Sequence, residues 1–316
     1  MKPATRQIIV LVYTILCIGV LSACTQPQVA DETRMPVEWT IITVKTVTPT
    51  LEMPTATVEP TDTSTPASTP TPSPTPTGSI PVCPLDEGEV RDDAFESAIM
   101  KRTIELKVYL PPCYDPDGDK DLPVLYLLHG LGADNNQWVK LGIPGMMDRL
   151  VSSGEITPYI IVFPQEPNFY TADATAFDRM IIEELRPYVD AQYNTKGERI
   201  YRAIGGLSRG AAWSLRIGAT YPQFFTAIGL HSLAIFEGDD VSTLRKLSGM
   251  ASDERPAIFI DIGTSDPGLQ VASEYEQSLN LTDVEHTWYQ FSGGHTEAYW
   301  QAHAMIYLRW YATLWQ

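Results

Sequence analysis

The sequence predicts an α/β fold in which a mostly parallel central sheet is flanked by helices. Two observations carry this prediction: short, wholly apolar runs recur along the chain, and stretches with helical spacing of apolar residues lie between them. A strand that is apolar throughout is buried on both faces, as in a parallel sheet covered by helices. The apolar runs are Val124–Leu128, Ile160–Phe163, Ile200–Ile204, Ala227–Leu230 and Ile258–Ile260.

Three further patterns complete this domain, which we place at residues 80–316. Thr103–Tyr109 alternates apolar and polar residues, as expected of an edge or antiparallel strand. Apolar residues recur every three or four positions within Phe177–Val189 and again within Glu297–Trp315. Both stretches therefore predict helices with one buried face.

The N-terminus has the features of an export signal. A short basic region precedes the apolar run Ile8–Leu21, which is shorter than a membrane span needs. The run ends in Leu21–Cys24, which resembles the bacterial lipobox, where the signal is cut before a cysteine that is then acylated. We therefore expect a lipoprotein signal peptide at residues 1–23, lipidation of Cys24 and an extracytoplasmic protein anchored to the bacterial cell membrane. An ordinary signal peptide or a short anchor with a chance cysteine is the alternative.

Residues 24–79 form a linker rich in threonine, proline and serine. Proline at this density cannot donate the hydrogen bonds of helices or sheets, and the segment has little apolar surface to bury, so we expect it to be disordered. Cys83 and Cys113 follow as the remaining pair of cysteines. In an oxidising compartment we expect a disulfide between them, and two unpaired buried thiols are the alternative.

The charge of the chain restricts its partners. The formal net charge is −17 at pH 7, which argues against binding nucleic acid, because that binding depends on lysine and arginine. The same charge disfavours electrostatic attachment to anionic lipids. The N-terminal lipid is therefore the expected contact with a membrane.

Ser208 is the candidate nucleophile. It stands at the centre of Gly206–Gly210, which matches G-x-S-x-G, between the apolar run that ends at Ile204 and the helix-prone stretch Ala211–Ala219. Glycines two positions to either side leave room for a sharp strand-to-helix turn that lifts the serine out of the sheet. The pattern predicts the nucleophile elbow of the α/β-hydrolase fold. A glycine-rich helix start that binds phosphate is the alternative.

His295 is the candidate general base, because a nucleophilic serine needs an imidazole in reach and this fold places it last in chain order. It lies in the loop Ser292–Thr296 after the predicted strand His286–Phe291, where such sheets gather their sites. The other histidines fit less well. His129 and His231 lie at strand ends, His286 opens the last strand at the wrong end of the sheet, and His303 lies within the final helix.

Asp266 is the candidate acid that orients the imidazole. It follows the C-terminal end of the predicted strand Ile258–Gly263, whereas Asp261 lies inside that strand and is expected to be structural. Some hydrolases draw their acid from the end of the preceding strand. The acidic cluster after that strand therefore remains an alternative, namely Glu237, Asp239 and Asp240.

Two backbone N–H groups are the candidate donors of an oxyanion hole, which stabilises the negative oxygen of a tetrahedral intermediate. One belongs to Arg209, directly after the nucleophile. The other belongs to Leu131, in the loop Leu128–Gly132 after an early predicted strand. His129 is expected to brace this loop rather than react. Alternatively, His129 and Gly130 simply end the strand.

With these residues in view, the domain resembles the esterase D family of α/β-hydrolases, which groups feruloyl esterases, enterochelin esterase-like hydrolases and mycolyltransferases. The resemblance runs from about Glu89 to Trp315. It rests on several ordered motifs: Val108–Pro112, Leu125–Gly130 with Trp138, Gly206–Gly210, Gly263–Asp266, and Gly293–His295 with Trp300. It implies the triad Ser208, Asp266 and His295 with Leu131 and Arg209 as oxyanion donors.

Two positions depart from this family pattern. Cys113 stands where many members have glycine, which fits the expected disulfide with Cys83. Ala211 replaces a second glycine that many members have after the elbow, and its methyl group should be tolerated in a helix. Neither departure touches the predicted triad.

The expected activity is hydrolysis of carboxylic esters through an acyl-enzyme, with an acylated plant polysaccharide or a siderophore ester as substrate. An acyltransferase that uses a sugar or lipid alcohol, or a catalytically silent surface-binding protein, is the alternative. No cofactor or metal is expected, because no Cys/His cluster has zinc spacing and Tyr126 stands where a calcium loop starting at Asp115 needs glutamate. Five aromatic residues are expected either in the core or as a substrate platform: Trp138, Tyr170, Trp213, Phe236 and Trp300.

Overall fold

The computed structural model describes residues 86–118, 121–167 and 171–316. The predicted signal peptide, the lipidation site Cys24, the linker and Cys83 lie outside the described residues and stay predictions. Cys113, in the loop after the second strand, is disulfide-bonded. Among the helices of the described ranges, none is long and apolar enough to cross a membrane.

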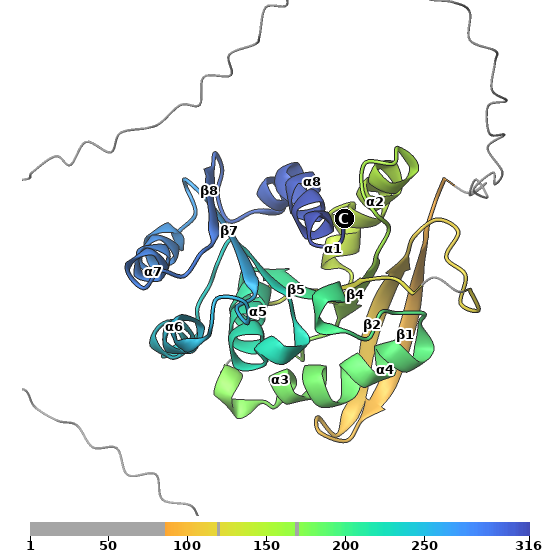
Figure 1. Ribbon diagram of the computed structural model, residues 1–316, viewed down its shortest axis with the longest axis horizontal. Coiled ribbons are helices and arrows are strands. Elements are labelled where there is room, and N and C mark those ends of the chain that lie inside the picture. The colour runs from red at the N-terminus through yellow and green to blue at the C-terminus, as the bar shows by residue number, and fades with distance from the viewer. Residues whose placement is uncertain (1–85, 119–120, 168–170) are drawn as a thin grey trace, which may run out of the picture. The chain divides into compact units, whose positions relative to one another are not determined.

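The described residues form one eight-stranded sheet with helices on both of its faces (Figure 1). The strand order is β1-β2-β4-β3-β5-β6-β7-β8. The first two strands run antiparallel to their neighbours and the other six are parallel to one another. The strands are β1 (Glu89–Ser97), β2 (Arg102–Leu110), β3 (Val124–Leu128), β4 (Ile160–Pro164), β5 (Arg202–Leu207), β6 (Ala227–His231), β7 (Ala257–Gly263) and β8 (Thr287–Phe291). The predicted α/β-hydrolase fold is confirmed.

The central strands are the ones that the sequence predicts best. Every residue of β3, β4, β5 and β6 is buried, which explains their unbroken apolar character. One detail of the prediction is wrong. Ile200 is 54% exposed and belongs to a 3₁₀ turn before β5, so that strand starts two residues later. The prediction of an edge or antiparallel strand at Thr103–Tyr109 is confirmed in its second form, because β2 pairs antiparallel with β1 and β4.

The helices divide into two layers, each with its own apolar core. One layer covers one face of the sheet with α1 (Gln137–Lys140), α2 (Ile143–Ser152) and α8 (Glu297–Thr313). The other covers the opposite face with α3 (Phe177–Met180), α4 (Arg186–Gln192), α5 (Arg209–Thr220), α6 (Asp239–Gly249) and α7 (Leu269–Leu281). A π-helical turn, Ile181–Leu185, joins α3 to α4, so the predicted helix Phe177–Val189 is continuous.

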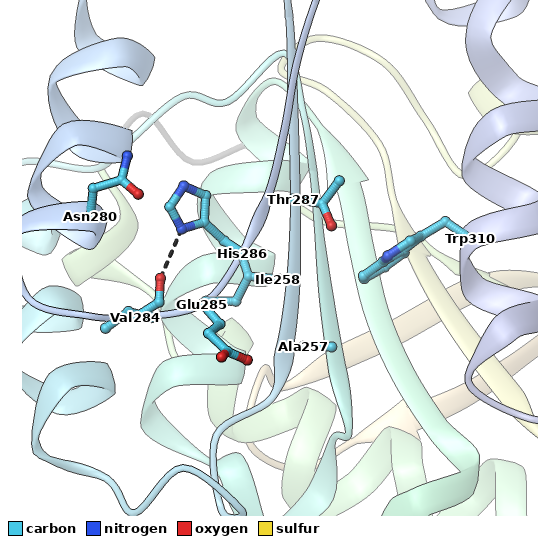
Figure 2. A pocket seen from close by; sticks show the side chains of 8 residues that line it. All are labelled: Ala257, Ile258, Asn280, Val284, Glu285, His286, Thr287 and Trp310. Carbon is cyan, nitrogen blue, oxygen red and sulfur yellow. Dashed lines mark hydrogen bonds between the residues drawn. The ribbon is translucent and has the colours of Figure 1, made fainter. Parts of the chain in front are cut away.

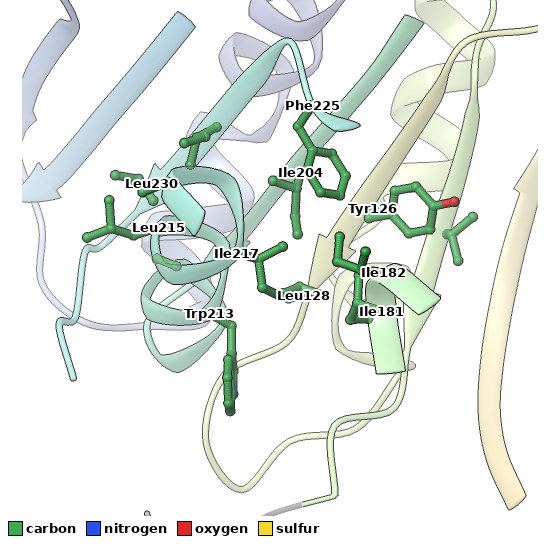
Figure 3. Packing of buried hydrophobic residues seen from close by; sticks show 14 of the residues in the cluster. Tyr126, Leu128, Ile181, Ile182, Ile204, Trp213, Leu215, Ile217, Phe225 and Leu230 are labelled. Atoms are coloured by element: carbon green, nitrogen blue, oxygen red, sulfur yellow. The ribbon is translucent and has the colours of Figure 1, made fainter. Parts of the chain in front are cut away.

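Helix α5 is the most deeply buried helix around the predicted nucleophile, with ten buried residues. Its Leu215 and Ile217 belong to the same apolar cluster as Ile204 of β5 and Leu230 of β6 (Figure 3). Burying a side chain of this size stabilises the fold by about 1.5–3 kcal/mol. The start of α5 is therefore firmly placed against the sheet, and Ser208 stands directly before it.

Candidate active site

Ser208 occupies the sharp turn between β5 and α5. Its backbone has φ 54° and ψ −118°, a conformation that a residue with a side chain adopts only under strain. Glycine is required on both sides of it, because a Cβ on Gly210 would lie 2.3 Å from the carbonyl oxygen of Leu128, and one on Gly206 would lie 2.5 Å from the carbonyl carbon of Gly210. The Ser208 N–H donates to the carbonyl of His231, 2.9 Å away. The serine thus lies in a tight turn between a strand and a helix, which is the geometry expected of a nucleophile elbow.

The structure brings His295 to Ser208 across 87 positions of sequence. The Nε2 atom of His295 is 2.9 Å from Ser208 Oγ, and its Nδ1 atom is 2.8 Å from Asp266 Oδ2. The loop that carries His295 lies between β8 and α8, and Thr296 caps α8 by accepting the N–H of Tyr299. An imidazole held in this way can take a proton from the serine hydroxyl at Nε2 while the carboxylate holds its other nitrogen.

Asp266 is buried in the turn between β7 and α7, with 1% of its side chain exposed. Its Oδ1 atom accepts the N–H of Gly268 at 2.8 Å, so the carboxylate is held by its own turn while Oδ2 faces His295. Asp239, the buried member of the alternative cluster, is instead bound by Arg216 at 2.6 Å. The geometry thus places Asp266, and not Asp239, on the imidazole.

The other four histidines are held elsewhere. His231 is fully buried and contacts Asp261, and His129 is held by the backbone on either side of its ring. His286 and His303 each contact a carbonyl oxygen of their own segment through Nδ1. Within the described residues, these contacts hold the four rings to partners other than Ser208.

The predicted oxyanion donors lie next to the serine. Arg209 is the first residue of α5, where the backbone N–H groups have no partner within the helix. The loop after β3 passes close by, because a Cβ on Gly130 would lie 3.6 Å from Ser208 Cβ. Leu131 follows in that loop and is 58% exposed. The two segments that carry the predicted donors, the start of α5 and the loop after β3, thus both lie next to Ser208.

Comparison with known proteins decides the family. The family described as "Putative esterase" matches residues 97–309, about two thirds of the chain. The chain belongs to this esterase family. Its structure also resembles that of a solved ferulic acid esterase, with a TM-score of 0.66 and 25% identity over 72% of this chain and 99% of that one.

Curated relatives of this esterase-family chain point the same way. A xylanase/feruloyl esterase of Xylanibacter ruminicola is 29% identical over 168 residues, which is 50% of this chain and 23% of that protein. An esterase of Mycobacterium tuberculosis is 30% identical over 135 residues, or 40% of this chain and 28% of that protein. The matched part thus spans about a quarter of the length of these two relatives.

The aromatic residues that the sequence singled out have different surroundings in the esterase domain. Trp138 and Trp213 are 1% exposed and belong to the two cores. Trp300 is also buried, but its ring meets that of His295 edge to face at 5.1 Å, and its Nε1 donates to Ser232 Oγ. Phe236 is half-buried beside Trp213, and Tyr170 lies outside the described residues. Of the described four, Trp300 is the one whose ring meets that of His295.

A pocket of about 490 Å³ lies at the other end of the same strands. Its lining includes Ala257 and Ile258 at the start of β7, and His286 and Thr287 at the start of β8 (Figure 2). Because these strands are parallel to β5, they start on the side of the sheet opposite to the one where Ser208 follows the end of β5. This pocket is therefore separate from the candidate active site.

The sequence predicted a structural role for Asp261, and the contacts of its carboxylate support that role. Asp261 is fully buried in β7, with Oδ1 2.8 Å from His231 Nδ1. Its Oδ2 atom accepts the hydroxyls of Tyr299 at 2.7 Å and Tyr307 at 2.8 Å, both from α8. Burial and the charge of Asp261 raise the pKa of both tyrosines, so they remain protonated donors. Asp261 thus fixes the start of α8, directly after His295.

Asp261→Asn should lower the free energy of unfolding by about 2–4 kcal/mol, because an amide turns a donor group toward hydroxyls and leaves buried bonds unmade. Urea denaturation at neutral pH measures the change. The matched control is Asp253→Asn, at an exposed position, which should stay within about 0.5 kcal/mol of the parent. A loss below about 1 kcal/mol for Asp261→Asn would show that the carboxylate does not hold α8.

Proposed function

We propose that this chain is an extracytoplasmic serine esterase that hydrolyses carboxylic esters through the triad Ser208, His295 and Asp266. The observation that carries the proposal is the single imidazole that contacts both the strained serine and a buried carboxylate, at 2.9 and 2.8 Å. Membership of the esterase family supports it, because that family match covers all three residues. The geometry is the one that acyl transfer by a serine requires.

The reaction proceeds in two steps. His295 takes the proton of Ser208 through Nε2 while the serine oxygen attacks the ester carbonyl, and Asp266 stabilises the imidazolium that results. The N–H groups of Arg209 and Leu131 donate to the oxyanion, each contributing about 3 kcal/mol to the transition state. His295 then returns the proton to the leaving alcohol. In the second step His295 takes a proton from a water molecule, whose oxygen attacks the acyl carbonyl. The bond to Ser208 Oγ breaks, the acid leaves, and His295 returns the proton to Oγ.

For the substrate, we propose an ester of an aromatic or short-chain acid with a polysaccharide or a siderophore. Two findings support the aromatic acid: the similarity to a ferulic acid esterase at 25% identity and the similarity to a bifunctional xylanase/feruloyl esterase. The triad histidine is accessible to such a substrate, since 32% of its side chain is exposed. Trp300 beside it offers an aromatic wall.

For the location, we propose a lipid anchor at Cys24 followed by the linker 24–79. The basic region, the apolar run and the Leu21–Cys24 sequence support this proposal. Several acyl chains on one cysteine provide stable attachment, whereas a single chain binds a membrane only reversibly. The esterase domain would then act on esters outside the cytoplasm.

The triad assignment is tested with a fluorophosphonate probe and p-nitrophenyl acetate. Ser208→Ala should abolish labelling, because the nucleophile is gone. His295→Ala should lower kcat by about 10⁴-fold or more, and Asp266→Asn by about 10³–10⁴-fold, because each leaves the serine without a correctly held base. Asp239→Asn, which changes a carboxylate bound to Arg216, should stay within about twofold. The opposite ranking of the two aspartate variants would overturn the choice of acid.

The substrate class is tested with a panel of p-nitrophenyl and methyl esters that carry acetyl, feruloyl and long-chain acyl groups. We expect kcat/KM to be highest for feruloyl or acetyl esters and at least about tenfold lower for long-chain esters, a difference of about 1.4 kcal/mol in transition-state binding. An added sugar alcohol should leave hydrolysis the main reaction. Acylated sugar in excess of free acid would identify a transferase instead.

The anchor is tested by fractionating cells that express the full chain. The parent should sediment with membranes and enter the detergent phase of Triton X-114. Cys24→Ser should remove the acylation site and move the protein out of the detergent phase, with the fluorophosphonate labelling of Ser208 unchanged per molecule. Equal partitioning of parent and variant would contradict the lipoprotein assignment.

A further inference from the structure

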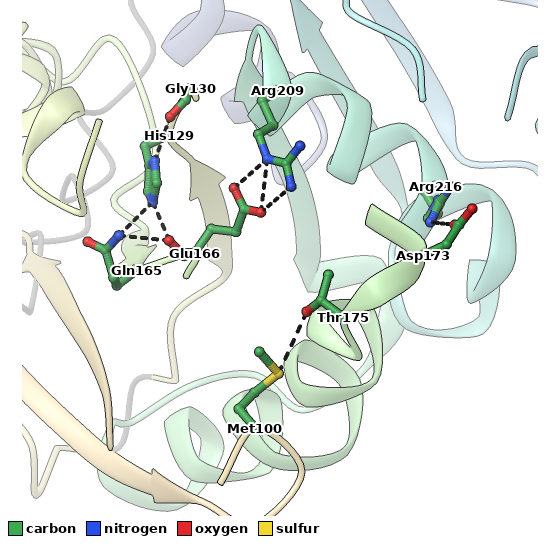
Figure 4. A network of polar contacts seen from close by, with 9 residues as sticks. All are labelled: Met100, His129, Gly130, Gln165, Glu166, Asp173, Thr175, Arg209 and Arg216. Carbon is green, nitrogen blue, oxygen red and sulfur yellow. Dashed lines mark hydrogen bonds and ion pairs between the residues drawn. The ribbon is translucent and has the colours of Figure 1, made fainter. Parts of the chain in front are cut away.

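A buried ion pair lies next to the turn that carries Ser208. The proposed reaction uses neither of its two charges. Arg209 Nη2 is 2.7 Å from Glu166 Oε1, and its Nε atom is 2.8 Å from Oε2. Only 8% and 3% of the two side chains are exposed. Figure 4 shows the two groups facing each other, one from the start of α5 and one from the segment after β4. Removing two charges from water is costly, so stability alone is a weak reason for such a pair.

The backbone of Glu166 is held in turn by His129. The Nε2 atom of His129 accepts the N–H of Glu166 at 2.9 Å, and its Nδ1 atom lies 2.8 Å from the carbonyl oxygen of Gly130 (Figure 4). An N–H can only donate and a carbonyl can only accept, so both contacts require a neutral imidazole with its hydrogen on Nδ1. Burial lowers the pKa of His129, which favours this neutral form.

The contact with Gly130 also sets the direction of a proposed oxyanion donor. The Gly130 carbonyl and the Leu131 N–H belong to one peptide group, which is planar and trans, so they point in opposite directions. Holding the carbonyl therefore fixes the N–H. The same carbonyl also accepts the N–H of Ala133 at 3.3 Å. The peptide group that carries the Leu131 donor cannot rotate without breaking the bonds to this carbonyl. The preceding peptide group is held separately, because the Gly130 N–H donates to Gln137 Oε1 at 2.8 Å.

These contacts form one continuous path between the two proposed donors. It runs from the peptide of Leu131 through His129 and Glu166 to Arg209, whose own N–H is the second donor. We propose that His129, Glu166 and the side chain of Arg209 are positioning residues that set the direction and spacing of the two oxyanion donors. The inference rests on the proposed function. A donor set in advance stabilises the oxyanion without reorganising during the reaction, and small displacements weaken it steeply.

Two variants test the pair. Glu166→Gln removes one charge but leaves Arg209 buried and uncompensated, so it can lose stability as well as position. The double variant Glu166→Leu, Arg209→Met replaces the pair with apolar side chains of similar volume, a change that is often tolerated in protein interiors. Both variants keep the backbone N–H of residue 209. A loss of kcat in either variant therefore does not come from removal of a donor group.

Three readouts separate positioning from folding. The fluorophosphonate probe counts working sites, so kcat is expressed per labelled Ser208. We expect kcat per site to fall between about tenfold and hundredfold in both variants, with KM unchanged. The inhibition constant of a trifluoromethyl ketone, whose serine adduct carries an oxyanion, should rise by the same factor. The matched control is Asp239→Asn, which breaks the ion pair of Arg216 further along α5 and should leave kcat and this constant unchanged.

The outcomes divide cleanly. A double variant with parental kcat per site and parental ketone affinity would overturn the inference. So would a rise in KM at unchanged ketone affinity, because the pair would then shape substrate binding and not the oxyanion site. A parent protein that neither labels nor hydrolyses esters would instead overturn the proposed function, before any variant is made.

Discussion

The strained turn at Ser208 is the constraint around which the rest of the site is arranged. Its φ of 54° and ψ of −118° cost on the order of 1–3 kcal/mol and persist only because neighbouring packing enforces them. That packing is the approach of α5 to the end of β3, so close that Gly210 has no room for a Cβ beside the carbonyl of Leu128. The buried contacts of α5 with the sheet offset this strain.

Different elements supply the parts that meet at this turn. Helix α8 places His295, the proposed base, because Asp261 binds Tyr299 and Tyr307 while Thr296 caps the helix one residue after His295. The turn before α7 holds the carboxylate with one oxygen free for the imidazole. The segment after β4 bonds the start of α5 through Glu166 and Arg209, and His129 ties the segment after β3 to Glu166. The residues of the proposed site are thus held by bonds that take no part in the proposed chemistry.

Prediction from sequence succeeded where a local pattern reflects burial. The run Val124–Leu128 forms β3 with the same bounds because every residue of it faces a core. Strand β1 was missed, since Glu89–Ser97 lies at the edge of the sheet and its charged residues give no apolar run. Glu166 was missed for another reason: its partner Arg209 is 43 positions away, and an ion pair between distant segments leaves no local signal.

The sequence by itself determined the layered fold and the serine at a glycine-bounded turn, because burial and steric room depend on local residue types. It also predicted the order in which an acid and a base follow that serine, because the predicted fold fixes that order along the chain. Only the tertiary structure decided which acid meets His295 and which contacts hold the oxyanion loops. Asp239 and Asp266 both follow strands that end on the same side of the sheet, so the sequence favoured Asp266 but left Asp239 as an alternative. The choice depends on a contact of 2.8 Å made by segments that the fold alone brings together.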